Sequence, residues 1–245
     1  MRLPVINQDP DRIAPTVNQN EGPEEIAVRG GEHGHTHADT RVLLVVHKTF
    51  RLATTRMVDA AERLDPAALQ PAIGPYWNFY TAVLHHHHHV EDTAAFPALS
   101  SVRPDMAALV DQLEEDHQRL TAAMDAVHLA VGVFGDRADP VTQQDLHDAL
   151  VALRDLFFAH LDIEDAKVIP VFAEAIAPKD WDRMDEQALK SIPRPHLPKA
   201  VGALDEVIRS LPDSERPSGP PPPIRLMLAL SWRKKWAEFV RPLTA

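Results

Sequence analysis

Apolar side chains recur every three or four residues in four long stretches of this chain, a spacing that places them on one face of an α-helix. The stretches run over residues 43–64, 73–94, 106–131 and 146–171. Prolines or glycines lie between them, where helices begin and end. No stretch shows the alternation of apolar and polar residues that marks a half-buried β-strand. The pattern therefore predicts an all-α fold in which four helices form an up-down-up-down bundle.

The two ends of the chain lack long periodic stretches. Residues 1–38 hold four of the nine glycines and little apolar periodicity, and we expect a flexible polar tail there. Residues 39–175 would form the bundle. Residues 176–245 contain shorter helical stretches between proline-rich connectors, and we expect a C-terminal helical extension packed on the bundle. Its basic end could instead rest on an anionic membrane surface, but the net charge of −11 favours packing on the bundle.

The composition narrows the chemistry that this chain can perform. None of its 245 residues is cysteine, which excludes disulfides, thiolate metal sites, iron–sulfur clusters and a cysteine nucleophile. The acidic net charge argues against nucleic acid as a partner, since phosphate binding needs a positive field. The sequence shows neither a secretory signal nor an apolar stretch long enough for a membrane span, so we expect a cytoplasmic protein. The plentiful metal-ligating side chains are 14 histidines and 36 acidic residues.

Histidine and glutamate interrupt the apolar stripes of the predicted bundle helices. Each stripe carries one histidine, and two of these histidines are followed four residues later by a glutamate on the same helical face. The residues are His47, His87, Glu91, His117, His160 and Glu164. A polar group facing a bundle core is costly unless it is satisfied. A lone core histidine can be satisfied by a hydrogen bond, whereas several histidines converging with two glutamates satisfy one another best through a metal.

The type and number of these ligands indicate which metals would suit the site. Imidazole and carboxylate ligands without sulfur suit iron, manganese or zinc. The set is larger than one tetrahedral zinc ion needs. The residues therefore predict two metal ions, bridged by the two glutamates and a solvent oxygen.

Four sequence motifs resemble those of the hemerythrin-like, HHE cation-binding proteins. The strings HHHHHVEDTAAFPAL (85–99) and HLDIEDAKVIPVF (160–172) are similar to the paired signatures of that family. VVHKTFR (45–51) resembles its first helix and LEEDHQRL (113–120) its third. The motifs occur in the family's order and cover about residues 40–175.

The resemblance implies a non-haem di-iron site inside the bundle, with Fe2+ or Fe3+ ions and a bridging oxo or hydroxo group; manganese or zinc would be less suited. Its ligand positions fall on His47, His87, Glu91, His117, His160 and Glu164. Among these, Glu91 and Glu164 would be the bridging carboxylates.

The run of five histidines leaves one choice of ligand open. His87 lies four residues before Glu91, and His88 lies four residues before Asp92. We prefer His87 because it lies on the apolar stripe, with His88 as the alternative.

The third helix departs from the pattern of the family's oxygen carriers. Those proteins have a second histidine four residues before the one at His117, and this chain has Leu113 there. The predicted site therefore has one imidazole fewer, which would leave a coordination position open. Glu114 could reach inward as a further ligand, or it could be a solvated acid on the helix surface.

Three functions fit such a site. The first is a di-iron protein that binds or reacts with a small oxidant, namely dioxygen, peroxide or nitric oxide. The second is a di-iron oxygenase that acts on a small organic substrate, for which residues 176–245 could wall a pocket. The third is an iron-storage or iron-sensing protein. The sequence does not separate binding or sensing from enzymatic turnover.

Overall fold

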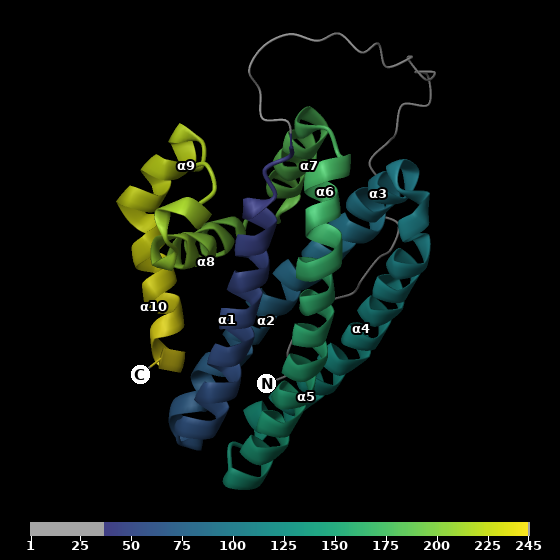
Figure 1. Ribbon diagram of the computed structural model, residues 1–245. Coiled ribbons are helices and arrows are strands. Elements are labelled where there is room, and N and C mark those ends of the chain that lie inside the picture. Colours follow the sequence, from purple (N-terminus) through teal and green to yellow (C-terminus); the bar gives the residue numbers. More distant parts are fainter. Residues whose placement is uncertain (1–36, 245) are drawn as a thin grey trace, which may run out of the picture. The chain divides into compact units, whose positions relative to one another are not determined.

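The computed structural model describes residues 37–244, and every regular element in that range is a helix (Figure 1). Residues from 35 onward belong to one compact unit. Nearly all of the tail expected over residues 1–38 lies outside the described residues. The predicted all-α fold class is confirmed.

Four long helices form the bundle. They are α1 (Arg41–Arg63), α2 (Pro66–Val90), α4 (Ala107–Asp136) and α5 (Pro140–Ile163). Helix α1 packs against α5 and α2, and α4 packs against the same two helices, so the four close into a ring. Between and after them lie η2 (Glu91–Ala95), α3 (Phe96–Val102), η3 (Pro104–Met106), η4 (Glu164–Val168) and α6 (Ile169–Ala175).

Capping residues explain where two of the long helices begin. The side chain of Asp65 accepts a hydrogen bond from the backbone N–H of Ala68, 2.9 Å long, and Pro66 occupies the first turn of α2. Asp139 and Thr142 form a reciprocal capping box at the start of α5. Each aspartate satisfies a backbone donor that the first helical turn leaves without a partner, and proline at the first position needs none.

The C-terminal helices pack directly on the bundle. They are α7 (Pro178–Ser191), α8 (Leu197–Ser210), η5 (Asp213–Glu215), α9 (Pro222–Met227), η6 (Leu228–Trp232) and α10 (Arg233–Thr244). Helix α8 contacts α1, and α10 contacts α2 and α8. Trp236, Val240 and Leu243 of α10 belong to the same buried apolar cluster as the bundle core. The basic end of the chain therefore has a buried apolar face.

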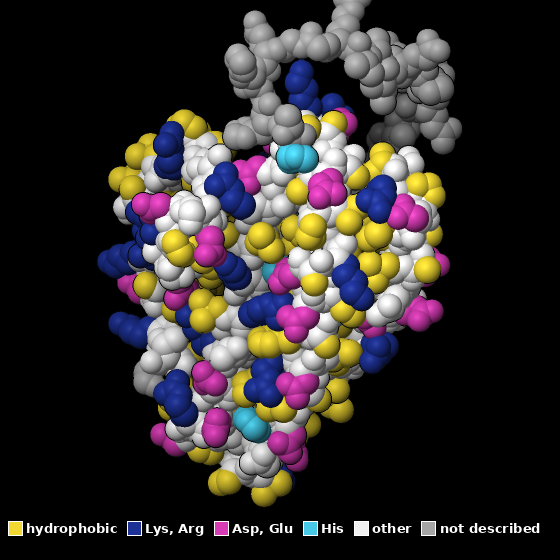
Figure 2. Space-filling model, viewed as in Figure 1, with side chains coloured by type: hydrophobic (Ala, Val, Ile, Leu, Met, Phe, Trp, Pro, Cys, Tyr) yellow, Lys and Arg dark blue, Asp and Glu magenta, His cyan; other side chains and the backbone are white. Residues whose placement is uncertain are grey.

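The surface carries charges of both signs. Figure 2 shows acidic and basic side chains interspersed over one face of the molecule, with few histidines among them. Among the described residues, no helix combines the length and the apolar character that a membrane crossing requires.

Candidate metal centre

A layer of histidines and glutamates separates two apolar clusters inside the bundle. On α4, His117 lies between Leu113 of one cluster and Leu120 of the other. On the helical run from α5 through η4, His160 and Glu164 lie between Phe157 and Val168 in the same way. Helices α1 and α2 contribute corresponding positions, so the polar layer lies at one level of the bundle.

Seven side chains of this layer form two groups. Within each group, the ligand atoms all lie within 4.8 Å of one another. The first cluster is His47, His87, Glu91 and Glu164. The second cluster is His88, His117 and His160. All seven come from α1, α2, η2, α4, α5 and η4, so every long helix of the bundle contributes.

The two glutamates of the first cluster also face histidines of the second cluster. Oε1 of Glu91 is 3.2 Å from Nε2 of His87, whereas its Oε2 is 3.7 Å from Nε2 of His117. Oε2 of Glu164 is 3.6 Å from Nε2 of His47 and 3.3 Å from Nε2 of His160. Each carboxylate therefore faces histidines of both clusters, the arrangement that a bridging carboxylate requires.

The ligand atoms of the layer have no hydrogen-bond partner although they are buried. The unpartnered atoms include Nε2 of His47, His87, His88, His117 and His160, and Oε2 of Glu91 and Glu164. Buried polar groups in proteins are almost always hydrogen-bonded, because an unmade bond costs free energy. Neutral imidazole nitrogens and carboxylate oxygens that converge in this way fit bound metal cations, which would take the place of the missing hydrogen bonds.

Two aspartates orient histidines of the layer from outside it. Nδ1 of His47 lies 2.6 Å from Oδ1 of Asp165, and Nδ1 of His117 lies 2.7 Å from Oδ1 of Asp92. Each aspartate directly follows one of the glutamates in the sequence. A carboxylate that accepts the Nδ1 proton fixes the tautomer in which Nε2 carries a lone pair. In each pair, the glutamate therefore faces the centre and the aspartate holds a histidine that faces it.

Both glutamates begin a π-helical turn. The N–H of Phe96 donates to the carbonyl of Glu91, and the N–H of Ile169 donates to the carbonyl of Glu164. A proline follows each of these donors, Pro97 and Pro170, and has no N–H with which to continue an α-helical ladder. π-Helical turns frequently occur at functional sites. Sequence reasoning did not identify these turns, although the proline six residues after each glutamate is a signal for them.

Burial and mutual repulsion set the protonation of the layer. Burial, reinforced by the charges of neighbouring imidazoles, lowers the pKa of His87 and His88 well below the ordinary value for histidine. Burial followed by the charge of Glu164 raises the pKa of Glu91 well above its ordinary value. Neutral imidazole is the form that binds metals. A cation would also relieve the repulsion between the two carboxylates.

The structure brings together all six residues expected as ligands, and His88, expected only as the alternative to His87, joins them. His88 joins His117 and His160, while His87 lies with His47, so the two neighbours in the histidine run belong to different clusters. Five imidazoles therefore surround the two carboxylates.

Glu114 belongs to neither cluster. It is exposed, and it lines a polar cavity of about 420 Å³ that His88 and His117 of the second cluster also line. Leu113, at the position where the family's oxygen carriers have a histidine, is fully buried among apolar side chains.

Among known protein families, the hemerythrin HHE cation binding domain matches residues 38–172, which is more than half of the chain. No curated protein and no solved structure matches the chain. The matched range contains both clusters and all four long helices.

Proposed function

The chain belongs to the hemerythrin HHE cation-binding family, and on this basis we propose that it is a non-haem di-iron protein that binds or reacts with a small oxidant. The oxidant would be dioxygen, peroxide or nitric oxide. The buried histidine and glutamate clusters are suited to a metal site. That the metal is iron, that two ions bind and that a small oxidant is the partner are our proposals.

One observation carries the proposal: seven buried side chains turn unpartnered ligand atoms toward two neighbouring points. We assign His47 and His87 to one ion, and His88, His117 and His160 to the other. Glu91 and Glu164, which face both clusters, would join the two ions. A single ion would leave several of these buried atoms without a partner, which is why two ions are favoured.

The surrounding side chains hold the ligands and cover part of the centre. Asp165 and Asp92 retain the Nδ1 protons of His47 and His117, so that the Nε2 atoms face the centre. Aromatic rings cover the histidines on the core side: Phe50 lies 5.1 Å from His87 between ring centroids. Iron held by these residues would supply a redox-active centre for a small oxidant.

An oxygenase that acts on an organic substrate is the second candidate function. It is favoured by an apolar cavity between the bundle and the C-terminal helices, which His87 and Glu91 help to line. Oxygen consumption that depends on an added organic molecule, with a new oxygenated product, would distinguish this function from simple oxidant binding.

The test begins with iron counting. The chain is freed of metal, loaded with ferrous iron without oxygen, passed through a desalting column and assayed for bound iron. We expect two iron ions per chain. Oxygen is then admitted while the visible absorption is recorded, and we expect a new absorption band from the bound iron.

Matched histidine variants control for general loss of histidine. The double variant His87→Ala/His160→Ala removes one ligand from each cluster and should bind no iron tightly. The double variant His128→Ala/His147→Ala changes two histidines outside both clusters and should bind two ions. Equal iron content in both variants, or a wild-type chain that holds no iron, would contradict the proposal.

A further inference from the structure

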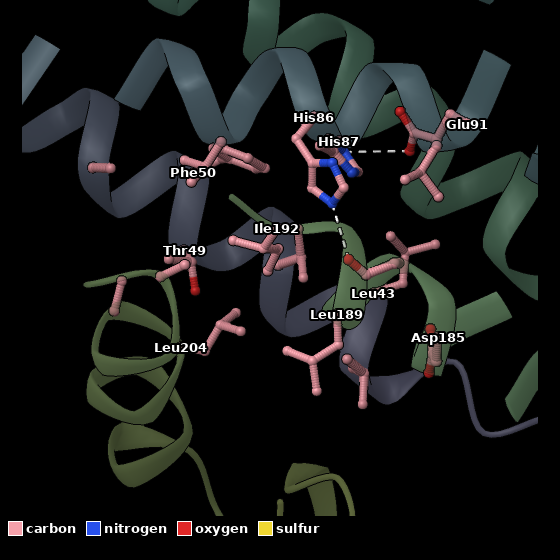
Figure 3. A pocket seen from close by; sticks show the side chains of 18 of the residues that line it. Leu43, Thr49, Phe50, His86, His87, Glu91, Asp185, Leu189, Ile192 and Leu204 are labelled. Atoms are coloured by element: carbon pink, nitrogen blue, oxygen red, sulfur yellow. Dashed lines mark hydrogen bonds and ion pairs between the residues drawn. The ribbon is translucent and has the colours of Figure 1, made fainter. Parts of the chain in front are cut away.

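A cavity of about 200 Å³ lies where the C-terminal helices cover the bundle. Helices α1 and α2 form one wall, and α7, α8 and α10 form the other. Figure 3 shows Leu43 of α1, Leu189 of α7, Leu204 of α8 and, directly after α7, Ile192 pointing into it. The extension beyond the HHE region therefore builds one wall of this pocket.

One end of the pocket is formed by two of the assigned metal ligands. His87 and Glu91 both line it, and Nε2 of His87 lies 3.2 Å from Oε1 of Glu91, a contact drawn in Figure 3. The ring of Phe50 packs against His87 and continues the same wall. A molecule in the pocket would therefore touch the side chains that hold the metal centre.

The polar side chains of the lining bond mostly to other protein groups. Thr49 Oγ1 donates to the carbonyl of Val45 (2.7 Å), and the hydroxyls of Tyr80 and Thr54 are 2.8 Å apart. His86 Nε2 lies 3.0 Å from the carbonyl oxygen of Ala188, a contact drawn in Figure 3. Both tryptophans of the lining also donate their indole N–H to protein oxygens. Apart from the assigned metal ligands His87 and Glu91, the lining offers a polar ligand little free hydrogen-bonding capacity.

Asp185 also lines the pocket, but its carboxyl does not present a permanent charge to a ligand. Burial, followed by the charges of Asp182 and Asp39, raises its pKa to about 7. The carboxyl is therefore protonated in a large fraction of molecules near neutral pH.

We propose that this pocket binds a small apolar organic molecule, a hydrocarbon or aromatic ring system of roughly ten non-hydrogen atoms, with one end against His87 and Glu91. The size follows from cavity volumes, since an engineered apolar cavity of about 150 Å³ holds benzene. An empty apolar cavity lowers stability because its lining atoms lose dispersion contacts, and an apolar ligand restores them. That the bound molecule would lie beside a reactive metal centre rests on the proposed function, whereas the binding itself does not.

The experiment uses the full chain as purified, with its metal content measured, and naphthalene as the probe. Binding is measured by calorimetry and by the rise in melting temperature, neither of which depends on activity. We expect naphthalene to bind at least tenfold more tightly than 1-naphthoate or 1-naphthylmethylamine. No binding of naphthalene, or equal or tighter binding of either charged probe, would overturn the proposal.

Matched variants locate the binding site. Leu204→Phe fills part of the pocket and should weaken naphthalene binding at least tenfold, as should Leu189→Phe from another wall. Leu129→Phe makes the same change at an exposed position and should leave binding unchanged. Unchanged binding in both pocket variants would overturn the assignment. If either pocket variant fails to fold, the other decides.

Iron counting on the same samples separates the two proposals. A chain that binds naphthalene but no iron would contradict the proposed function and leave the pocket supported. A chain that binds two iron ions but no naphthalene would do the reverse.

Discussion

The imidazole rings of His88 and His117 are stacked, with their centroids 4.1 Å apart and their planes inclined by 15°, although they belong to different helices. His88 thus adds to the second cluster an imidazole that α4 does not supply, because Leu113 occupies the corresponding place on that helix. The stacked pair leaves Nε2 of both rings buried and without a hydrogen-bond partner.

Replacing His88 should therefore remove metal from one cluster only. His88→Ala leaves the second cluster with two imidazoles, and we expect bound iron to fall from two ions per chain toward one. His89→Ala removes the adjacent, exposed histidine of the same run and should retain both ions. Iron is counted after anaerobic loading and desalting. Two ions in the His88→Ala protein would show that His88 is not a ligand.

The aspartates behind the histidines should affect affinity more than stoichiometry. Asp165→Asn weakens the acceptor for the Nδ1 proton of His47, and losses of this kind typically cost about 10–100-fold in metal affinity. Asp162→Asn is the matched control, because Asp162 also pairs with Arg51 but does not contact His47. Affinity is measured by competition with a chelator. An equal loss in both variants would assign the effect to Arg51 rather than to His47.

Asp185 should make stability depend on pH in a predictable direction. Its folded pKa is raised from 3.8 to about 7, so the folded state holds a proton that the unfolded state releases. Stability from this group is present at low pH and is lost as the pH rises through about 4 to 7. Partial exposure reduces the effect of such a shift to about 2 kcal/mol.

The matched comparison isolates this contribution. Relative to the wild type, Asp185→Asn should gain about 2 kcal/mol in the free energy of unfolding between about pH 4 and pH 8. Asp155→Asn removes the same charge from an exposed position and should show no such gain. Urea unfolding at the two pH values measures both. A constant difference between wild type and Asp185→Asn across this range would refute the prediction.

Replacing two different glycines by alanine should change the free energy of unfolding in opposite directions. A Cβ at Gly202 in α8 would lie 2.7 Å from Cβ of Trp236 in α10, so the helices must separate. We expect Gly202→Ala to lower the free energy of unfolding by about 1–3 kcal/mol. Gly132→Ala in α4 meets nothing within 4 Å and should raise it by about 0.5–1 kcal/mol, because alanine favours helix. Urea unfolding of both variants checks the contrast, and destabilisation by both would contradict it.

The sequence by itself determined the helical fold and most of the candidate site. The three-to-four residue spacing of apolar side chains defines one buried face per helix, and helices with such faces must pack against one another. Histidine and glutamate on those faces are therefore brought inside, as the positions of His47, His117 and His160 illustrate. The spacing along one helix was sufficient to predict which residues share a face, because residues i and i+4 lie on the same side of any α-helix.

Only the tertiary structure showed that His88 lies in a candidate metal cluster together with His117 and His160. Consecutive residues on a helix point about 100° apart, so sequence spacing favoured one of His87 and His88 for a single inward direction. In the structure α2 has neighbours on two sides, and His87 meets His47 of α1 while His88 meets His117 of α4. How a helix is rotated relative to its neighbours depends on the packing of the whole bundle, which no local pattern records.

The pocket also required the tertiary structure. Its walls combine Phe50 of α1 with Leu204 of α8, residues that are far apart in the chain. Sequence patterns predict the apolar face of each helix. They do not predict where two such faces pack incompletely and leave a cavity. That gap depends on side-chain shapes from several helices at once, because the interior is otherwise close-packed.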